Sequence, residues 1–388
     1  MSSVVIVAAK RTPVGAFQGI LSGVSATELG ANAIRAAVES AGLGTHDVSD
    51  VIMGCVLPAG TGQSPARQAL LKAGLSQHTT ALTVNKVCGS GLKAVMLGHD
   101  LIKAGSATTV VAGGMENMNA APYLLTKARG GYRMGHAEIF DHMLYDGLQD
   151  AYAGVAMGVY ADATAKEKGF SREDQDAFAI LSATRALEAI KSGAFVEEIS
   201  PIEIADRKGA ILVAQDEPPS KVNIDKIPTL RPAFTKDGTV TAANASSISD
   251  GGAALVLMEE SAATTKPLAR IVGHASHSHE PEWFTLAPIG AVKKLLTQVG
   301  WHKDEVDLFE INEAFAVVTL AAIKELALDP SKVNVHGGAC ALGHPIGASG
   351  ARILVTLIHA LKQKGGKRGI ATLCIGGGEA VAVAIEML

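Results

Sequence analysis

The sequence has few aromatic residues, few charged residues and few cysteines. Aromatic side chains make up 4% of its 388 residues and charged side chains 19%, and the four cysteines are scattered without a CxxC pair. This spacing disfavours a disulfide framework or a thiolate zinc site and predicts reduced thiols. The net charge of −4 leaves no basic surface, so nucleic acid is a poor candidate partner.

Long apolar runs are also missing. None approaches the ~18 residues that cross a bilayer, and the first strand-like run, Val4 to Val7, leaves no room for a signal or transit peptide. We therefore expect a cytoplasmic protein without membrane contacts, unless a mitochondrial leader has already been removed. What the chain has in excess is glycine, 42 residues, beside a hydrophobic fraction of 48%. This composition predicts a tightly packed α/β protein with two or three domains and many sharp turns.

An internal repeat relates the two ends of the chain. Three segments recur in the same order, displaced by 257 to 263 residues: 48–53 with 305–310, 90–95 with 349–354, and 113–116 with 376–379. Each half alternates helix-period stretches (28–42, 291–300) with short apolar strands (110–112, 371–373). That alternation predicts buried sheets with helices on both faces.

The segment between the halves differs in character. It carries all five tyrosines, and it contains one clear helix, which starts at the N-cap Ser171, runs to Ile190 and is closed by Gly193. The remainder is polar and loop-rich, as in a ligand-binding lid. Residues 250–258 read as a core strand that returns to the first half. The predicted units are 1–117 with 250–267, then 118–249, then 268–388.

Cys88 is the first candidate for chemistry. It lies between a short strand and a buried helix that begins near Ser90, with Gly89 and Gly91 beside it. A thiol at a helix N-terminus meets unpaired amides and the positive end of the helix dipole, which predicts a lowered pKa. A small core cysteine before a turn is an equally good explanation of this segment alone.

His344 is the second candidate. It stands between Gly343 and Pro345, ahead of the helix that repeats the one after Cys88. If the two related helices pack around a common axis, the thiol and the imidazole converge. A structural or exposed turn histidine is the competing explanation.

Two further residues and one cluster are more ambiguous. Cys374 ends an apolar strand before Gly376, where packing is the simpler explanation, and Asn312 is most simply the N-cap of a following helix. His274, His277 and His279 have ligand-like spacing, but we expect loop histidines in solvent and no metal. A zinc-dependent protein built on this cluster remains an alternative that predicts bound metal.

Taken together, four motifs resemble those of the thiolase family: 85–91 (NKVCGSG), 312–316 (NEAFA), 343–352 (GHPIGASGAR) and 374–378 (CIGGG). They occur in the family's order and span essentially the whole chain. The resemblance implies a duplicated five-layered α/β/α/β/α core with an inserted loop domain, and usually a homotetramer formed as a dimer of dimers. It implies acyl-CoA and CoA as substrates, with no cofactor beyond them.

The resemblance also implies roles for the catalytic residues. Cys88 is the nucleophile that carries the acyl group, His344 takes its proton, and Cys374 is the second acid and base. Asn312, through a water, and His344 hold the enolate oxygen, while the amides of Cys88 and Gly376 hold the acyl-enzyme oxygen. A covalent intermediate of this kind predicts ping-pong kinetics.

Other positions match the family's CoA contacts: Ser246, Leu148, Phe234, Met157 and Ala245. The segment 145–151 resembles the short-chain, acetoacetyl-CoA branch, which implies an acetyl-CoA C-acetyltransferase.

Two departures from that branch stand out. Ala156 replaces its histidine, which we expect to open space for longer substrates, and no arginine occurs near Ser220 and Lys221 to hold the nucleotide. The runner-up is therefore a broader-chain 3-ketoacyl-CoA thiolase of fatty-acid β-oxidation. A ketoacyl-carrier-protein condensing enzyme would use a second histidine in place of the Asn312 motif. A catalytically dead CoA- or lipid-binding module would have lost Cys88, His344 or Cys374.

Overall fold

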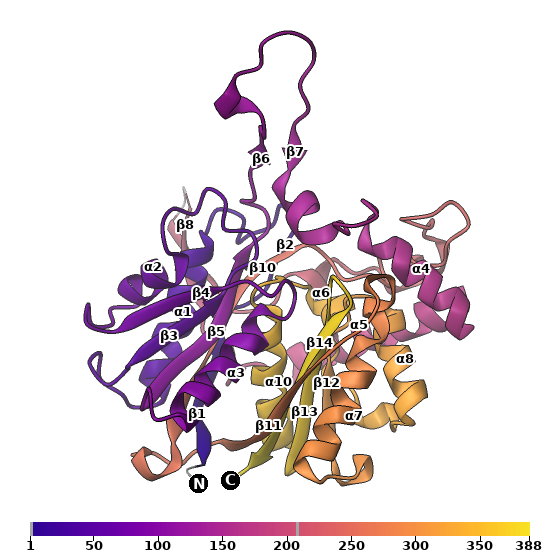
Figure 1. Cartoon of the computed structure of the whole chain (residues 1–388). Helices are drawn as coiled ribbons and strands as arrows, with labels where there is room; N and C mark the ends of the chain where they lie inside the picture. Colours follow the sequence, from indigo (N-terminus) through magenta and orange to yellow (C-terminus); the bar gives the residue numbers. More distant parts are fainter. Residues whose placement is uncertain (1–2, 207–208) are drawn as a thin grey trace.

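The computed structural model describes residues 3–206 and 209–388, and its core is a mixed sheet flanked by helices (Figure 1). The ten-stranded sheet has the order β12-β13-β14-β11-β1-β10-β5-β3-β4, with β2 paired to β10. The strands are β1 Val4–Arg11, β2 Gly15–Ala16, β3 Asp50–Gly54, β4 Thr80–Val84, β5 Thr109–Asn117, β10 Ser249–Glu259, β11 Ala269–Ser278, β12 Leu308–Ile311, β13 Arg368–Ile375 and β14 Glu379–Met387.

The helices of the two halves cover this sheet. They are α1 Ala26–Ser40, α2 Pro65–Lys72, α3 Ser90–Lys103, α7 Ala287–Val299, α8 Ala316–Leu326, α9 Ala339–Leu342 and α10 Ser349–Lys364. Within the described residues, none of the helices is long and apolar enough to cross a membrane.

The layers follow from where the apolar side chains gather. One cluster, from α3, α10 and both halves of the sheet, fills the middle of the molecule. Helices α1 and α2 cover the outer face of the first half, and α7 and α8 cover that of the second (Figure 1). The strands between these layers are therefore buried on both faces, as β5 is at every residue, whereas the edge strand β4 is half-buried or exposed along its length. The two halves of the sheet, the helices between them and the helices outside them form the five-layered arrangement that the resemblance implies.

The predicted repeat corresponds to two helices that cross in the central layer. Helices α3 and α10 start at Ser90 and Ser349, and glycines allow their backbones to touch. A Cβ on Gly350 would lie 2.3 Å from the Leu92 nitrogen, and one on Gly91 would lie 2.8 Å from the Ala351 nitrogen. Only residues without a side chain fit this crossing. It brings the loops that precede the two helices, one from each half, to the same place.

The segment between β5 and β10 contains helices, short hairpins and a projecting loop (Figure 1). The helix expected after Ser171 is α5 Arg172–Ser192, with a capping box from Asp174 and a left-handed C-cap at Gly193. The other elements are β6 Tyr123–Leu124, β7 Phe140–Asp141, a π-helical turn Met143–Leu148, α4 Met157–Lys168, β8 Ile202–Asp206, β9 Gly209–Val213 and α6 Pro218–Lys221.

Strand β10 returns the chain to the first half, as the sequence predicts. It pairs antiparallel with β1 on one side and with β5 on the other. This pairing favours joining residues 250–267 to the first unit, and we propose 1–117 with 250–267, 118–249 and 268–388 as the domains.

Candidate active site

Cys88 lies in a strained turn between β4 and α3. The preceding residue, Val87, has φ of 46°, a left-handed conformation that is costly for a β-branched side chain. The Ser90 hydroxyl holds the turn, since it donates to the Val87 carbonyl at 2.6 Å and accepts the Lys86 N–H at 2.8 Å. The turn presents the thiol to a cavity, whereas Cys55, Cys340 and Cys374 are buried.

The expectation of a lowered pKa at Cys88 is wrong. Burial raises the pKa of this thiol to about 11, although the amides of Gly376 and of Cys88 itself act in the opposite direction. A thiolate here would lose its hydration, and the short row of amides at the helix start does not replace that water. The resting thiol of Cys88 is therefore neutral, and it would have to lose its proton in order to act as a nucleophile.

His344 is held in one orientation by Ser349. The Ser349 hydroxyl donates to the Pro345 carbonyl at 2.9 Å and lies 2.6 Å from Nδ1 of His344. Because a carbonyl only accepts, the serine oxygen is left to accept from Nδ1–H. This places the imidazole lone pair on Nε2, which is buried and has no hydrogen-bond partner among the described residues. Burial, with the charge of Arg352, lowers the pKa of His344 to about 3, so the ring is neutral at rest.

Glu116 joins the loops of the two halves behind the thiol. Its buried carboxylate accepts the N–H groups of Val56, Leu57 and Gly347 at 2.9, 3.1 and 2.9 Å. Burial raises the pKa of Glu116 to about 7. Sequence reasoning noted Glu116 only as part of a repeated motif, because nothing local shows that its partners lie on two distant loops.

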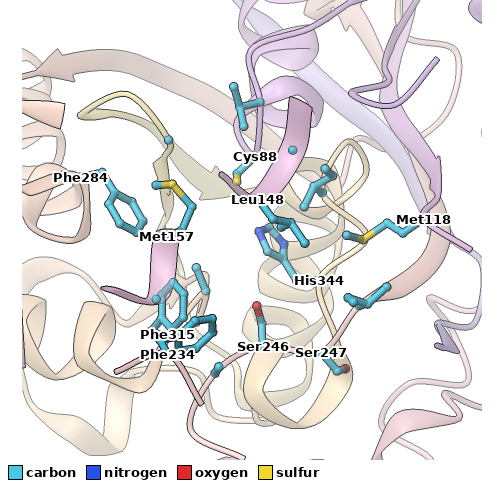
Figure 2. Close-up of a pocket in the computed structure, with 18 residues that line it drawn as sticks. Cys88, Met118, Leu148, Met157, Phe234, Ser246, Ser247, Phe284, Phe315 and His344 are labelled. Atoms are coloured by element: carbon cyan, nitrogen blue, oxygen red, sulfur yellow. The ribbon is translucent and has the colours of Figure 1, made fainter. Parts of the chain in front are cut away.

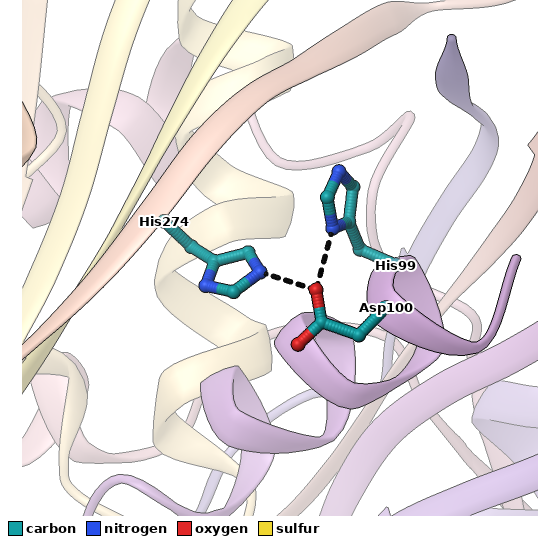
Figure 3. A group of neighbouring side chains, drawn as sticks. All are labelled: His99, Asp100 and His274. Carbon is teal, nitrogen blue, oxygen red and sulfur yellow. Dashed lines mark hydrogen bonds and ion pairs between the residues drawn. The ribbon is translucent and has the colours of Figure 1, made fainter. Parts of the chain in front are cut away.

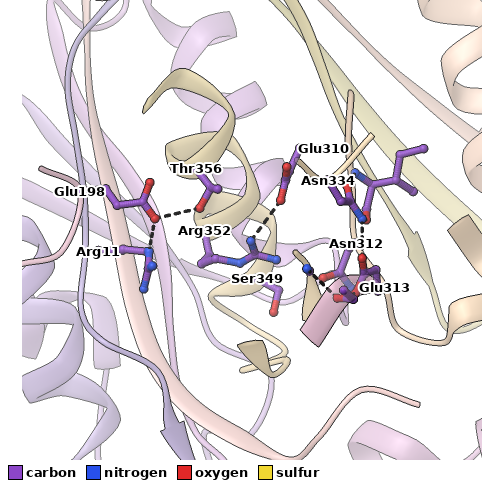
Figure 4. A network of polar contacts seen from close by, with 12 residues as sticks. Arg11, Glu198, Glu310, Asn312, Glu313, Asn334, Ser349, Arg352 and Thr356 are labelled. Atoms are coloured by element: carbon purple, nitrogen blue, oxygen red, sulfur yellow. Dashed lines mark hydrogen bonds and ion pairs between the residues drawn. The ribbon is translucent and has the colours of Figure 1, made fainter. Parts of the chain in front are cut away.

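Asn312 is not a helix N-cap. Helix α8 begins at Ala316, and the Asn312 amide nitrogen instead lies 3.5 Å from Nδ1 of His344. Its Oδ1 is buried and has no hydrogen-bond partner in the described part of the chain. The next residue, Glu313, accepts from the Ser182 hydroxyl at 2.7 Å and the Asn334 amide at 2.8 Å, which fixes this segment (Figure 4).

Cys374 lies inside β13, fully buried behind the cavity. Burial and then the charge of Cys88 raise its pKa well above the usual value, which places the two thiols within electrostatic reach of each other.

An apolar cavity of about 240 Å³ gathers most of the predicted residues (Figure 2). In the close-up the thiol of Cys88 lies above the imidazole of His344. Two of the predicted site residues, Cys374 and Asn312, do not line the cavity. The other predicted site residues do line it: Cys88, His344, Gly376, Ser246, Leu148, Phe234, Met157 and Ala245. Sequence reasoning missed further lining residues, among them Met118, Ser247, Phe284, Phe315 and Ile346. Phe315 and Ile346 lie in recognised motifs, but Phe284 carried no signal.

The histidine cluster is not a solvated loop. His274 and His277 lie on β11, and His279 follows its end. All three are half-buried, and along β11 half-buried residues such as His274 alternate with buried ones such as Ala275, as expected of a strand. His274 reaches across to α3 and not to its neighbours in sequence.

The residues of the two departures from the short-chain branch do not line the cavity. Ala156 is the N-cap residue of α4 and is not among the residues that line the cavity, so the extra space expected there is not seen. Lys221 pairs with Glu217 at 2.7 Å and lines an adjoining hollow with Lys226.

Comparison with known proteins agrees with this geometry. The family description "Thiolase, N-terminal domain" matches residues 4–261, and "Thiolase, C-terminal domain" matches residues 265–387. An acetyl-CoA acetyltransferase of Escherichia coli (strain K12) is 53% identical over 393 residues, which covers 100% of both chains.

Solved structures give the same result. A crystal structure of the Bacillus anthracis acetyl-CoA acetyltransferase has a TM-score of 0.97 and 43% identity, and the match covers 100% of this chain and 99% of that one. The Acat5 thiolase from Ascaris suum in complex with coenzyme A has a TM-score of 0.95 and 43% identity, with 100% of both chains covered. The chain therefore belongs to the thiolase family and is an acyltransferase similar to acetyl-CoA acetyltransferases.

Proposed function

We propose that the protein catalyses the reversible condensation of two acetyl-CoA molecules to acetoacetyl-CoA and CoA. The observation that carries the proposal is the meeting of three groups at one apolar cavity: the Cys88 thiol, the free Nε2 of His344 and, behind the wall, the Cys374 thiol. The names of the similar proteins support the same reaction.

In the first half-reaction, Cys88 attacks the carbonyl carbon of acetyl-CoA while its proton passes to Nε2 of His344. The C–S bond to CoA breaks, and the departing CoA thiolate takes the proton of Cys374. The acetyl group is then a thioester on Cys88. Its oxygen lies near the N–H groups of Gly376 and Cys88, which already interact with the free thiol.

In the second half-reaction, the Cys374 thiolate removes a proton from the methyl group of a second acetyl-CoA. Protonated His344 and, through a water, Asn312 stabilise the enolate oxygen where charge develops. The enolate carbon attacks the acetyl thioester, and a C–C bond forms as the bond to Cys88 breaks. Cys88 recovers its proton from His344, so every group returns to its starting state.

CoA needs a tunnel for its pantetheine arm and cations for its phosphates. The cavity offers apolar walls from Phe234, Met157 and Leu148, with the Ser246 hydroxyl on one side (Figure 2). An adjoining hollow shares Ser247 and contains Lys221 and Lys226. We propose that these lysines bind the phosphates of CoA in place of the missing arginine. We also propose that the reaction needs no cofactor in addition to its CoA substrates.

The expected assembly and location are proposals of the same kind. The projecting loop between β6 and β7 exposes Tyr123, Leu125, Met134 and Ile139, an apolar set that favours burial against another subunit. We propose a homotetramer in the cytoplasm.

The test is CoA-dependent cleavage of acetoacetyl-CoA and longer 3-ketoacyl-CoAs by the wild type, Cys88→Ser and Cys374→Ser. Each variant is expected to lose more than about a thousandfold in rate. Cys55→Ser, at a buried cysteine that lines neither the cavity nor the adjoining hollow, is the matched control and should stay near wild type. Equal rates for Cys88→Ser and wild type would exclude the mechanism. A preference for six or more carbons would move the assignment to the β-oxidation thiolases.

A further inference from the structure

A second group of chemically active side chains lies where the two halves meet, away from the thiols. His99 and Asp100 belong to the last turns of α3, and His274 lies on β11 of the second half (Figure 3). His99 is nine residues after Ser90, which places it roughly 13 Å along the helix from the start of α3. Any role of this cluster is therefore separate from the acyl-transfer chemistry.

The three side chains converge on one point. Nδ1 of His99 lies 3.0 Å from Oδ1 of Asp100, and Nε2 of His274 lies 2.8 Å from the same oxygen. The two rings meet edge to face, with centroids 5.0 Å apart. One donor atom from each residue lies within 4.8 Å of the other two. In a tetrahedral zinc site with bonds of 2.0–2.1 Å, donor atoms lie about 3.3 Å apart, so small side-chain shifts admit an ion.

We propose that His99, Asp100 and His274 bind a divalent transition-metal ion of the zinc type. Two imidazole nitrogens and one carboxylate oxygen form a borderline donor set that suits Zn²⁺, Co²⁺ or Ni²⁺, whereas Mg²⁺ and Ca²⁺ require oxygen ligands. Each neutral ring would bind the ion through the nitrogen that now faces Oδ1 and would carry its single proton on the other ring nitrogen.

The two histidines of the cluster are largely buried and the aspartate is exposed, as expected of a site that an ion enters from solvent. The side chains of His99 and His274 are 11% and 18% exposed, while that of Asp100 is 53% exposed. The imidazoles are thus held by packing, and the carboxylate side is open for the ion to enter with a water as fourth ligand. Lys103 lies one turn further along α3 and acts on His99 as a positive charge, which weakens cation binding without blocking it.

The ion would connect the end of α3 to β11. It would thus link the two halves through Asp100 and His274, which are 174 residues apart in the sequence. Since an ion that binds the folded state stabilises it by mass action, Zn²⁺ should raise the melting temperature. The ion should not change turnover directly, because the cluster does not line the cavity that holds Cys88.

The experiment is a Zn²⁺ titration of metal-free protein by calorimetry, after Cys88 has been alkylated with iodoacetamide so that its thiol cannot bind the ion. We expect one ion per chain. His99→Gln and His274→Gln should each weaken binding by more than about tenfold, since loss of even an outer-sphere partner costs that much. His277→Gln is the matched control, because His277 lies on the same strand and its ring packs against that of His279, away from the proposed ligands.

The melting temperature is a second measurement, which distinguishes loss of the metal site from misfolding of a variant. Zn²⁺ should raise the melting temperature of the wild type and of His277→Gln, and not that of His274→Gln. Absence of micromolar binding by the wild type, equal binding by His274→Gln, or loss of binding in His277→Gln would overturn the site. Equal affinity for Mg²⁺ would overturn its assigned chemistry.

Discussion

Replacing Ser349 with alanine should impair the reaction without touching either thiol. The Ser349 hydroxyl is the group that fixes the Nδ1–H tautomer of His344, at 2.6 Å from that nitrogen. Without it, the remaining polar neighbour of Nδ1 is the Asn312 amide at 3.5 Å, at the limit of a hydrogen bond. The imidazole can then place its proton on Nε2, and in that form it cannot accept the proton of Cys88.

The size of the effect follows from the contact that is lost. Loss of a hydrogen bond to a buried polar group costs about 1–2 kcal/mol. If that energy shifts the balance between the two tautomers, the ratio of the productive Nδ1–H form to the Nε2–H form falls by a factor of about 5 to 30, and kcat falls by at most that factor. The fall should appear in kcat for acetoacetyl-CoA cleavage, while KM stays near the wild-type value because Ser349 does not line the cavity.

Thr356→Val provides the matched control. Thr356 lies two turns further along α10, is equally buried, and donates its hydroxyl to Glu198 at 3.0 Å (Figure 4). Both variants should lose similar free energy of unfolding in urea, but only Ser349→Ala should lose kcat. The same kcat in Ser349→Ala and wild type, or an equal loss in Thr356→Val, would refute the tautomer argument.

Three other predictions concern the thiol, the helix crossing and a buried acid. Because burial raises the pKa of Cys88 to about 11, its alkylation by iodoacetamide should accelerate about tenfold per pH unit up to about pH 10; a plateau near neutral pH would contradict this. Gly350→Ala should destabilise the protein by about 1–3 kcal/mol in urea, since the new Cβ meets the Leu92 nitrogen, while Gly23→Ala, which has open space, should be neutral. Burial raises the pKa of Glu116 to about 7 in the folded protein. Its contribution to the free energy of unfolding is therefore fully present below about pH 4.5 and is lost as the pH rises through 7. The free energy of unfolding of the wild type, relative to Glu116→Gln, should therefore fall by about 3 kcal/mol across that range, and a constant difference would argue against the shift.

The sequence determined the fold and most of the site, because both depend on features that are local or repeated. The repeat of 90–95 in 349–354 predicted two related helices, and they cross in the central layer. The cap at Ser171 predicted α5, and the apolar run 250–258 predicted β10. Glycine-flanked Cys88 and His344 could be selected in the same way, since tight turns before helices leave a visible pattern.

The tertiary structure alone decided what surrounds those groups. A pKa depends on burial and on charges brought in from elsewhere, so the raised pKa of Cys88 was opposite to the expectation from its own helix. Glu116 acts through amides on two distant loops, and His274 finds its partners in the other half of the chain. Local sequence fixes which conformation a segment prefers, whereas desolvation and contacts between distant segments exist only once the chain has folded.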